Sequence, residues 1–369
     1  MKTLISSKVK VWLPLFLLLV VLIYLVAGVL KKEQSVDMQP LEPVHRKVSG
    51  AIVSIDPRME LLAAQYILSG FQAVSLLDCD YKDAMISYFA EMGKHRSVQT
   101  FRQIHQRGIF WNAPPALMMH LTPVPELAIR VPIPDETIRQ LNTTQRRINS
   151  WRSQLSQFVE TSHFADFYFQ HQNFYNHTVE QVSSLVEKHP YVDDLETYFG
   201  QQQETYHIIL MPLIMANYGV MVDGANGREV YAMVSEYRDQ DGLNESFLRN
   251  MIWHEFAHSF VDPLGFAYEQ ELRQSEHLYD QIKAKVRPAG YTNWTITVNE
   301  HIVRAVVIRL KQIRFGDQVA RTRYQEDIDR GFDYLDLLLD RLVYFEENRH
   351  LYPAFSDFYP QLVAALYEL

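Results

Sequence analysis

A run of twenty uncharged, largely apolar residues near the N-terminus, VWLPLFLLLVVLIYLVAGVL (residues 11–30), most constrains what this chain can fold into. A helix needs roughly 20 such residues to cross a bilayer, whereas the apolar core of a cleaved signal peptide spans only about 7 to 15. Lysines precede the run, and Lys31 and Lys32 follow it at once. We therefore expect an uncleaved transmembrane signal anchor at residues 11–30, in preference to a signal peptide cleaved near Ala27.

The rest of the sequence contains no second run of this kind, which predicts that it stays in one compartment. The lysines before residue 11 favour a cytoplasmic N-terminus at residues 1–10. We therefore expect the remaining chain to be held at the cell membrane on the extracytoplasmic side, either periplasmic or extracellular.

Composition narrows the kinds of site that the chain can build. The net charge of -9 argues against a nucleic-acid surface. The single cysteine, Cys79, excludes intramolecular disulfides and a thiolate-rich metal site. Any bound metal must therefore use histidines and carboxylates. Nothing in the sequence indicates an oligomeric state.

The pattern of apolar residues predicts an α+β fold with mostly helical flanks. Residues 31–50 mix charge, proline and glycine without periodicity, as a linker does. Residues 51–200 read as mainly helical; one helix begins with Asp56 and Pro57 in the order of a helix cap. Residues 201–265 hold strands and a central helix, and residues 266–369 are again helical. We expect residues 51–369 to form one domain.

The short apolar runs of residues 204–237, separated by Asn, Gly and the turn DGANG, predict two or three strands that include a hairpin. NYGVMV, residues 217–222, is our candidate for an edge strand to which an extended peptide could add. A hairpin with no ligand is the alternative.

The stretch WHEFAHSF, residues 253–260, contains two candidate metal ligands and a candidate general base. We expect its helix to run from about Asn244 to Val261 and to end before Pro263. His254 and His258 are four residues apart, so both project from one face, as two imidazoles that share a metal ion must. Glu255 lies a step round the helix, where it could take a proton from a metal-bound water. The alternative is a pair of hydrogen-bonded core histidines.

A third ligand is expected downstream, in the helix TITVNEHIVRAVVIRLKQI (residues 295–313), which Thr295 would cap. Glu300 is the one acid on its apolar stripe, which also includes Ile296, and burying an unpaired carboxylate is very costly. Arg304, at i+4, could instead satisfy this carboxylate without any metal. His301 points elsewhere on the helix. The competing acids lie in a polar segment: Glu269, Glu271 and Glu276.

These motifs resemble known families. H-E-x-x-H followed by NEHIVRA looks like a gluzincin, and DPRMELLAAQYIL, WHEFAHSFVDP, NEHIVRAV and the C-terminal GFDYLDLLLDRLVYFEENRHLYPAFSDFYP resemble a bacterial family, domain of unknown function 4932, regarded as zincin-like metallopeptidases. The resemblance covers most of residues 50–365. It implies a single zincin domain with zinc at His254, His258 and Glu300 and with Glu255 as the base.

The sequence therefore predicts a membrane-anchored zinc metallopeptidase that hydrolyses a peptide or protein substrate through a zinc-activated water, with Glu255 as general base. Tyr291, Tyr218 and His207 are candidates for the donor that stabilises the developing oxyanion. The alternative function is a catalytically inactive zincin-fold protein that binds or assembles cell-envelope components. A further alternative has no metal at all.

Overall fold

The structure is a computed structural model that describes residues 39–369 except 77, 216, 236–237 and 240–241. Leu41–Leu369 form one compact unit. The anchor expected at residues 11–30 lies outside the described residues. In the part of the chain that is described, no helix combines the length and the apolar character needed to cross a membrane.

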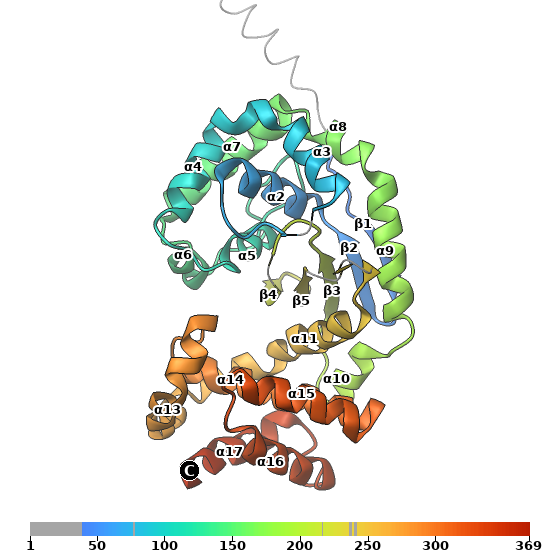
Figure 1. The fold of residues 1–369 in the computed structure, drawn as a ribbon. Coiled ribbons are helices and arrows are strands. Elements are labelled where there is room, and N and C mark those ends of the chain that lie inside the picture. Colours follow the sequence, from blue (N-terminus) through green and yellow to red (C-terminus); the bar gives the residue numbers. More distant parts are fainter. Residues whose placement is uncertain (1–38, 77, 216, 236–237, 240–241) are drawn as a thin grey trace, which may run out of the picture. The chain divides into compact units, whose positions relative to one another are not determined.

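A five-stranded sheet lies at the centre of this unit, in the order β1-β2-β3-β5-β4 (Figure 1). Its strands are β1 (Val44–Val48), β2 (Ala51–Ile55), β3 (Thr205–Leu210), β4 (Tyr218–Gly224) and β5 (Gly227–Val234). β2, β3 and β5 are parallel, and β1 and β4 run antiparallel to their neighbours. A small ribbon, β6 (Arg238–Asp239) with β7 (Gly242–Leu243), follows. The predicted hairpin and the predicted edge strand, β4, are both confirmed.

The first two strands correct the sequence prediction, because β1 lies inside the segment expected to be a linker and β2 opens the region expected to be helical. Their hairpin turns through Ser49 and Gly50, which have φ of 44° and 78°. β2 then pairs in parallel with β3, which follows much later in the chain. Such long-range pairing leaves no local signal in the sequence.

Helices follow β2, as predicted. They are α2 (Pro57–Ser69), α3 (Asp80–Tyr88), α4 (Arg96–His105), α5 (Ala113–Met119), α6 (Asp135–Gln140), α7 (Gln145–Thr161), α8 (Phe164–Gln170), α9 (Gln172–Val186) and α10 (Tyr191–Phe199). Asp56 caps α2 by accepting a hydrogen bond from the Arg58 backbone N–H at 2.8 Å. Pro114 and Pro115 lie in the first turn of α5, where a proline loses no helical hydrogen bond.

After the sheet come α11 (Glu245–Ala267), α12 (Glu269–Leu272), α13 (His277–Val286), α14 (Trp294–Phe315), α15 (Asp317–Asp329), α16 (Leu335–Glu347) and α17 (Phe355–Ala365). α11 packs against β4 and β5 and also against α14 (Figure 1). Two glycines permit this close packing. A Cβ atom at Gly219 of β4 would lie 2.7 Å from the Glu255 carbonyl oxygen, and one at Gly265 would lie 1.8 Å from Asn299 Oδ1.

The end predicted for the central helix is wrong, since α11 continues through Pro263 to Ala267. Proline has no N–H to donate to the carbonyl of Ser259, four residues earlier. That carbonyl instead accepts a hydrogen bond from Gln203 Nε2 at 3.4 Å. The continuation keeps Asp262 helical, one turn after His258.

The cap predicted for the third-ligand helix is also wrong. Asn293, not Thr295, caps α14, with its Oδ1 accepting from the Ile296 backbone N–H at 2.9 Å. Asparagine is a strong N-cap residue, so the earlier start has a local cause. Ile296 is 37% exposed and does not belong to the buried stripe that the sequence predicted.

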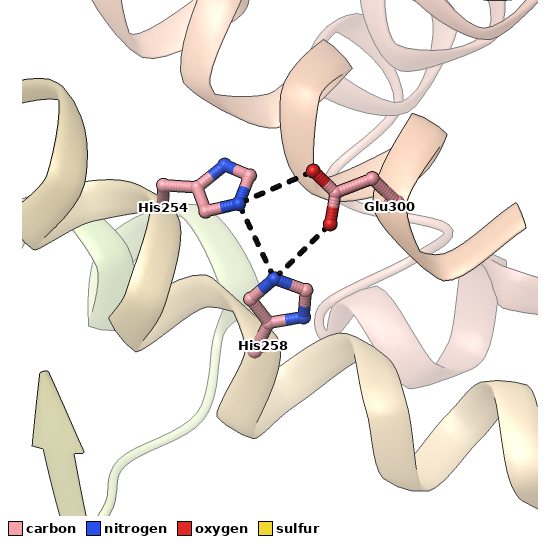
Figure 2. A group of neighbouring side chains, drawn as sticks. All are labelled: His254, His258 and Glu300. Carbon is pink, nitrogen blue, oxygen red and sulfur yellow. Dashed lines mark hydrogen bonds and ion pairs between the residues drawn. The ribbon is translucent and has the colours of Figure 1, made fainter. Parts of the chain in front are cut away.

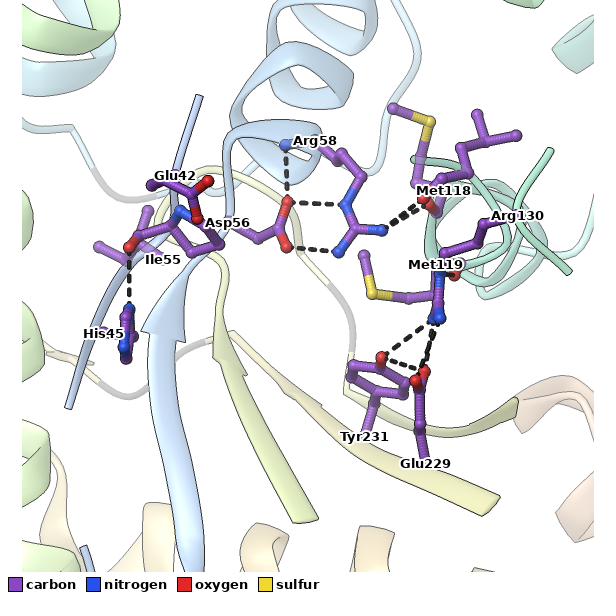
Figure 3. Close-up of polar contacts among 12 residues, drawn as sticks. Glu42, His45, Ile55, Asp56, Arg58, Met118, Met119, Arg130, Glu229 and Tyr231 are labelled. Carbon is purple, nitrogen blue, oxygen red and sulfur yellow. Dashed lines mark hydrogen bonds and ion pairs between the residues drawn. The ribbon is translucent and has the colours of Figure 1, made fainter. Parts of the chain in front are cut away.

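The face of the sheet away from α11 carries ion pairs (Figure 3). Tyr206 of β3 packs its ring on Phe256 of α11, so the next residue, His207, points to the other face, where it stacks on Tyr231. Tyr231 Oη donates to Glu229 at 2.7 Å. The paired charges there are Asp56 with Arg58, and Glu229 with Arg130.

Candidate metal centre

Two histidines of α11 and one glutamate of α14 meet where the helices pack (Figure 2). His254 Nε2 lies 3.3 Å from His258 Nε2. Glu300 places Oε1 3.4 Å from His254 Nε2 and Oε2 3.4 Å from His258 Nε2. The structure therefore brings together the three residues that the sequence predicted as metal ligands.

The cluster fits a metal ion by its donor types and its spacing. Ligand atoms about 2.0–2.2 Å from a tetrahedral zinc are separated by roughly 3.4 Å, close to the separations found here. His254 and Glu300 are buried and His258 is half-buried. The two imidazole Nε2 atoms and a carboxylate face the same point, an arrangement that a cation would satisfy. The cluster could hold a metal ion, whose identity the geometry leaves open.

Two neighbouring side chains hold these residues in place. His258 Nδ1 lies 3.1 Å from Asp262 Oδ1, and Tyr291 Oη donates to Glu300 Oε1 at 3.0 Å. A carboxylate on the far nitrogen of a ligand histidine fixes its orientation and raises its basicity. The sequence analysis missed Asp262 because it ended the helix too early, although the i+4 spacing from His258 was visible.

The ion pair considered as an alternative for Glu300 is also present. Arg304 Nη2 lies 2.5 Å from Glu300 Oε1. However, Arg304 also forms an ion pair with Asp327, so its charge is shared between two carboxylates. Glu300 Oε2 faces His258. The arginine therefore compensates Glu300 only in part.

The charges around the cluster shift its pKa values in different directions. Burial lowers the pKa of His254 to about 4, against the opposing effect of Glu300. Burial also opposes protonation of His258, but Asp262 and Glu300 outweigh it and raise its pKa well above the usual value. Burial would raise the pKa of Glu300, yet Arg304 and His254 bring it well below the usual value. In the metal-free protein His258 is therefore protonated, and its positive charge replaces that of a bound cation beside Glu300.

Glu255, the predicted base, lies beside the cluster and is not one of its three converging residues. Its side chain is buried, and this burial raises its pKa to about 8 despite the opposing effect of His258. It lines the same cavity as His254, His258 and Glu300. A carboxylate in this position can accept a proton from a water molecule in the cavity.

The cavity above the cluster has a volume of about 640 Å³. β4, α11 and α14 contribute to its walls, together with the segments around residues 109–112 and 288–291. Tyr218 and Tyr291, two of the predicted oxyanion donors, line it, whereas His207 lies on the other face of the sheet. Tyr218 Oη is buried and has no hydrogen-bond partner among the described residues.

The competing acids predicted from sequence lie apart from the cluster. Glu269, Glu271 and Glu276 are exposed. His301, expected to point elsewhere on the helix than Glu300, is buried, and its Nδ1 lies 2.7 Å from the Thr297 carbonyl oxygen. Neither these three glutamates nor His301 belongs to the candidate metal cluster.

Comparison with known proteins places the chain in a family. No curated protein and no solved structure matches it significantly. Residues 51–365 match the family described as Domain of unknown function (DUF4932). This range agrees with the resemblance of the motifs and includes the whole metal-ligand cluster. The chain therefore belongs to the DUF4932 family.

Proposed function

We propose that this protein is a zinc-dependent peptidase with a zincin-like fold, anchored in the cell membrane by residues 11–30 with its domain on the extracytoplasmic side. The observation that carries the proposal is the convergence of His254, His258 and Glu300 in the wall of an open cavity, with Glu255 beside them. Three protein ligands leave a coordination position free, as catalytic zinc sites do and structural ones do not.

Glu255 acts as the general base in this proposal. Zinc held by the three ligands would supply Lewis-acid polarisation of a water molecule or a carbonyl group. Glu255 takes the proton of the attacking water and returns it to the leaving amine. Burial raises the pKa of Glu255 in the metal-free protein, and a cation bound beside it would lower that pKa again and favour the carboxylate that accepts the proton.

The edge strand β4 positions the substrate. Only one side of β4 pairs within the sheet, and Gly219 brings the strand against the backbone of Glu255. An extended peptide can add to the free side and thereby lie across the cavity. Tyr218, at the start of β4, has a hydroxyl without a partner among the described residues, whereas the hydroxyl of Tyr291 is already used by Glu300. Tyr218 is therefore the better candidate for the oxyanion donor.

The rim of the cavity favours substrates with bulky apolar side chains. Four of its lining residues are large, apolar and at least partly exposed: Phe110 is 50%, Trp111 44%, Phe266 60% and Ile296 37% exposed. Such exposed apolar groups gathered around one opening mark a binding surface. We expect cleavage of peptides that carry aromatic or large aliphatic residues next to the cleaved bond.

A peptide-library cleavage assay on the zinc-loaded protein tests the proposal. Loss of a general base lowers the rate by roughly 10²- to 10⁴-fold, so Glu255→Gln should abolish detectable cleavage while zinc content stays stoichiometric. Glu245→Gln, which removes an exposed acid from the same helix, is the matched control and should cleave normally. Undiminished cleavage by Glu255→Gln would show that Glu255 is not the general base.

The inactive alternative has its own observation in favour, namely the Arg304 ion pair that partly satisfies Glu300. If the wild-type protein binds zinc but cleaves no peptide in the library, this alternative replaces the peptidase. If it binds no metal, both functions fail.

A further inference from the structure

A second cavity lies beyond Arg304 and shares no lining residue with the first. Its volume is about 440 Å³. The first turns of α11, together with α14 and α15, supply its lining residues: Asn244, Ser246, Phe247, Asn250, Met251, Arg304, Arg323, Glu326 and Arg330. The size is within the usual range for small-ligand sites, about 300–1,000 Å³.

Three arginines in this lining share one buried carboxylate. Asp327 is fully buried and forms ion pairs with Arg304, with Arg323 at 2.8 Å and with Arg330 at 3.2 Å. Arg304 has a second partner in Glu300, at 2.5 Å, whose other oxygen faces His258. Two buried carboxylates, one of them shared with the histidines, do not balance three arginines. Glu326 offers little more, because it is 3.7 Å from Arg323 and its side chain is 48% exposed.

The surroundings of the cavity add further positive potential. Lys311 of α14 is only 7% exposed and makes no hydrogen bond or ion pair with the residues that the structure describes. Burial and the nearby Arg323 lower its pKa to about 8. Arg249 of α11 also acts on Lys311. Buried cations normally have partners, so this excess of positive charge favours the binding of an anion.

Hydrogen-bond donors accompany the charge. Arg304 Nε is buried and has no hydrogen-bond partner among the described residues. Ser246 and Asn250, which carry a hydroxyl and an amide, are also lining residues, in the first turns of α11. The positive end of a 23-residue helix favours anions. Phe247 and Met251 supply an apolar wall beside these donors.

We propose that this cavity binds the phosphate group of a small phosphorylated ligand. Guanidinium groups match phosphate oxygens in bidentate pairs, which favours phosphate over a singly charged carboxylate. The apolar wall and the volume leave room for the organic part of a phosphomonoester. The site is separate from the proposed metal centre, since none of its lining residues is a metal-ligand candidate or the base; Arg304 is the one lining residue that contacts Glu300.

Titration calorimetry on the chelator-treated full chain tests this site without competition from a metal. Inorganic phosphate and phenyl phosphate are the probes, and acetate at equal ionic strength is the comparison. We expect saturable binding of both phosphates, with phenyl phosphate tighter, and none of acetate. If acetate binds as tightly as phosphate, or if phosphate shows no saturable binding, the proposal is wrong.

Variants of α15 locate the binding. Arg330→Gln removes a half-exposed cation and should weaken phosphate binding by about tenfold, the loss of roughly one charge-assisted hydrogen bond. Arg321→Gln removes an exposed arginine of the same helix outside the lining and should change nothing. Glu326→Gln removes the repelling acid and should tighten binding. Equal weakening by Arg321→Gln and Arg330→Gln, or weaker binding by Glu326→Gln, would contradict a site in this cavity.

Discussion

The two faces of the sheet bury charge in different ways. On the face away from α11, each carboxylate oxygen of Asp56 faces Arg58, at 2.9 and 2.7 Å, and Arg130 pairs with Glu229 (Figure 3). On the α11 side, two imidazoles and the carboxylate of Glu300 converge and border a cavity (Figure 2). Acids are balanced by arginines on the first face. On the second, the ligand atoms face one another.

This difference distinguishes charge that only stabilises the fold from charge in a candidate functional site. A buried pair with complete hydrogen bonding needs no further partner, and breaking it mainly destabilises the fold. A buried group of acceptors that opens to solvent has a place for a cation. Burial and a shifted pKa occur on both faces, so neither property alone identifies the site.

Glu300→Gln should produce the largest change, in metal affinity. The amide keeps the shape of the side chain but is a poor zinc ligand. Zinc sites in small domains have binding free energies of about 10–16 kcal/mol, so one of a few ligands contributes several kcal/mol and its loss weakens binding about a thousandfold. Competition with a zinc chelator measures the affinity. Glu269→Gln, which changes an exposed acid of α12, is the control. Unchanged affinity in Glu300→Gln would remove Glu300 from the ligand set.

Asp56→Asn should show the opposite behaviour, a loss of stability without loss of metal. Burial would raise the pKa of Asp56, but Arg58 outweighs it, so the pKa lies below the usual value and the pair is ionised. Asparagine can still cap α2, yet it leaves Arg58 without a countercharge, which costs about 3 kcal/mol. Denaturant unfolding and zinc analysis of the same sample measure both quantities. A drop in zinc content in this variant would mean that the two faces are not independent.

Local patterns predicted the site well and the sheet less well. His254, His258 and Glu300 could be found because helical spacing places them, and β4 because its hairpin turn is local. β2 could not be placed, since its partner β3 follows after nine helices among the described residues. Asp262 was lost because proline usually ends a helix, and only the tertiary contact from Gln203 shows why this helix continues. Packing also decides which face of α14 is buried.

Glu60 should make the free energy of unfolding depend on pH. It lies near Asp56 on the charge-paired face, which is the face of the sheet away from α11. It is buried in α2 and hydrogen-bonds to Tyr81, and burial raises its pKa to about 8 from a usual value of 4.5. The folded state therefore holds a proton that the unfolded state releases above about pH 4.5. Its contribution to stability is complete below that pH and is lost as the pH rises towards 8.

Glu60→Gln should remove this dependence. Relative to the variant, the wild type should lose roughly 2 kcal/mol of unfolding free energy between pH 5 and pH 7. Denaturant unfolding of both proteins at the two pH values gives the difference, from which the contributions of other titrating groups largely cancel. If the gap between the two proteins stays constant with pH, Glu60 is ionised in the fold and this face holds an uncompensated acid, contrary to the comparison.

Asp262→Asn should have the smallest effect, again on metal affinity. Asp262 faces His258 Nδ1 at 3.1 Å from the next turn of α11. Carboxylates in this position orient a ligand histidine, and their loss typically weakens metal binding 10- to 100-fold; we expect about tenfold, since asparagine can still accept the hydrogen bond. Chelator competition measures it, with Asp280→Asn, an exposed acid of α13, as control. An effect as large as that of Glu300→Gln would mean that Asp262 itself is a ligand. No effect at all would mean that packing alone orients His258, unlike the charge-paired face, where carboxylates hold the arginines.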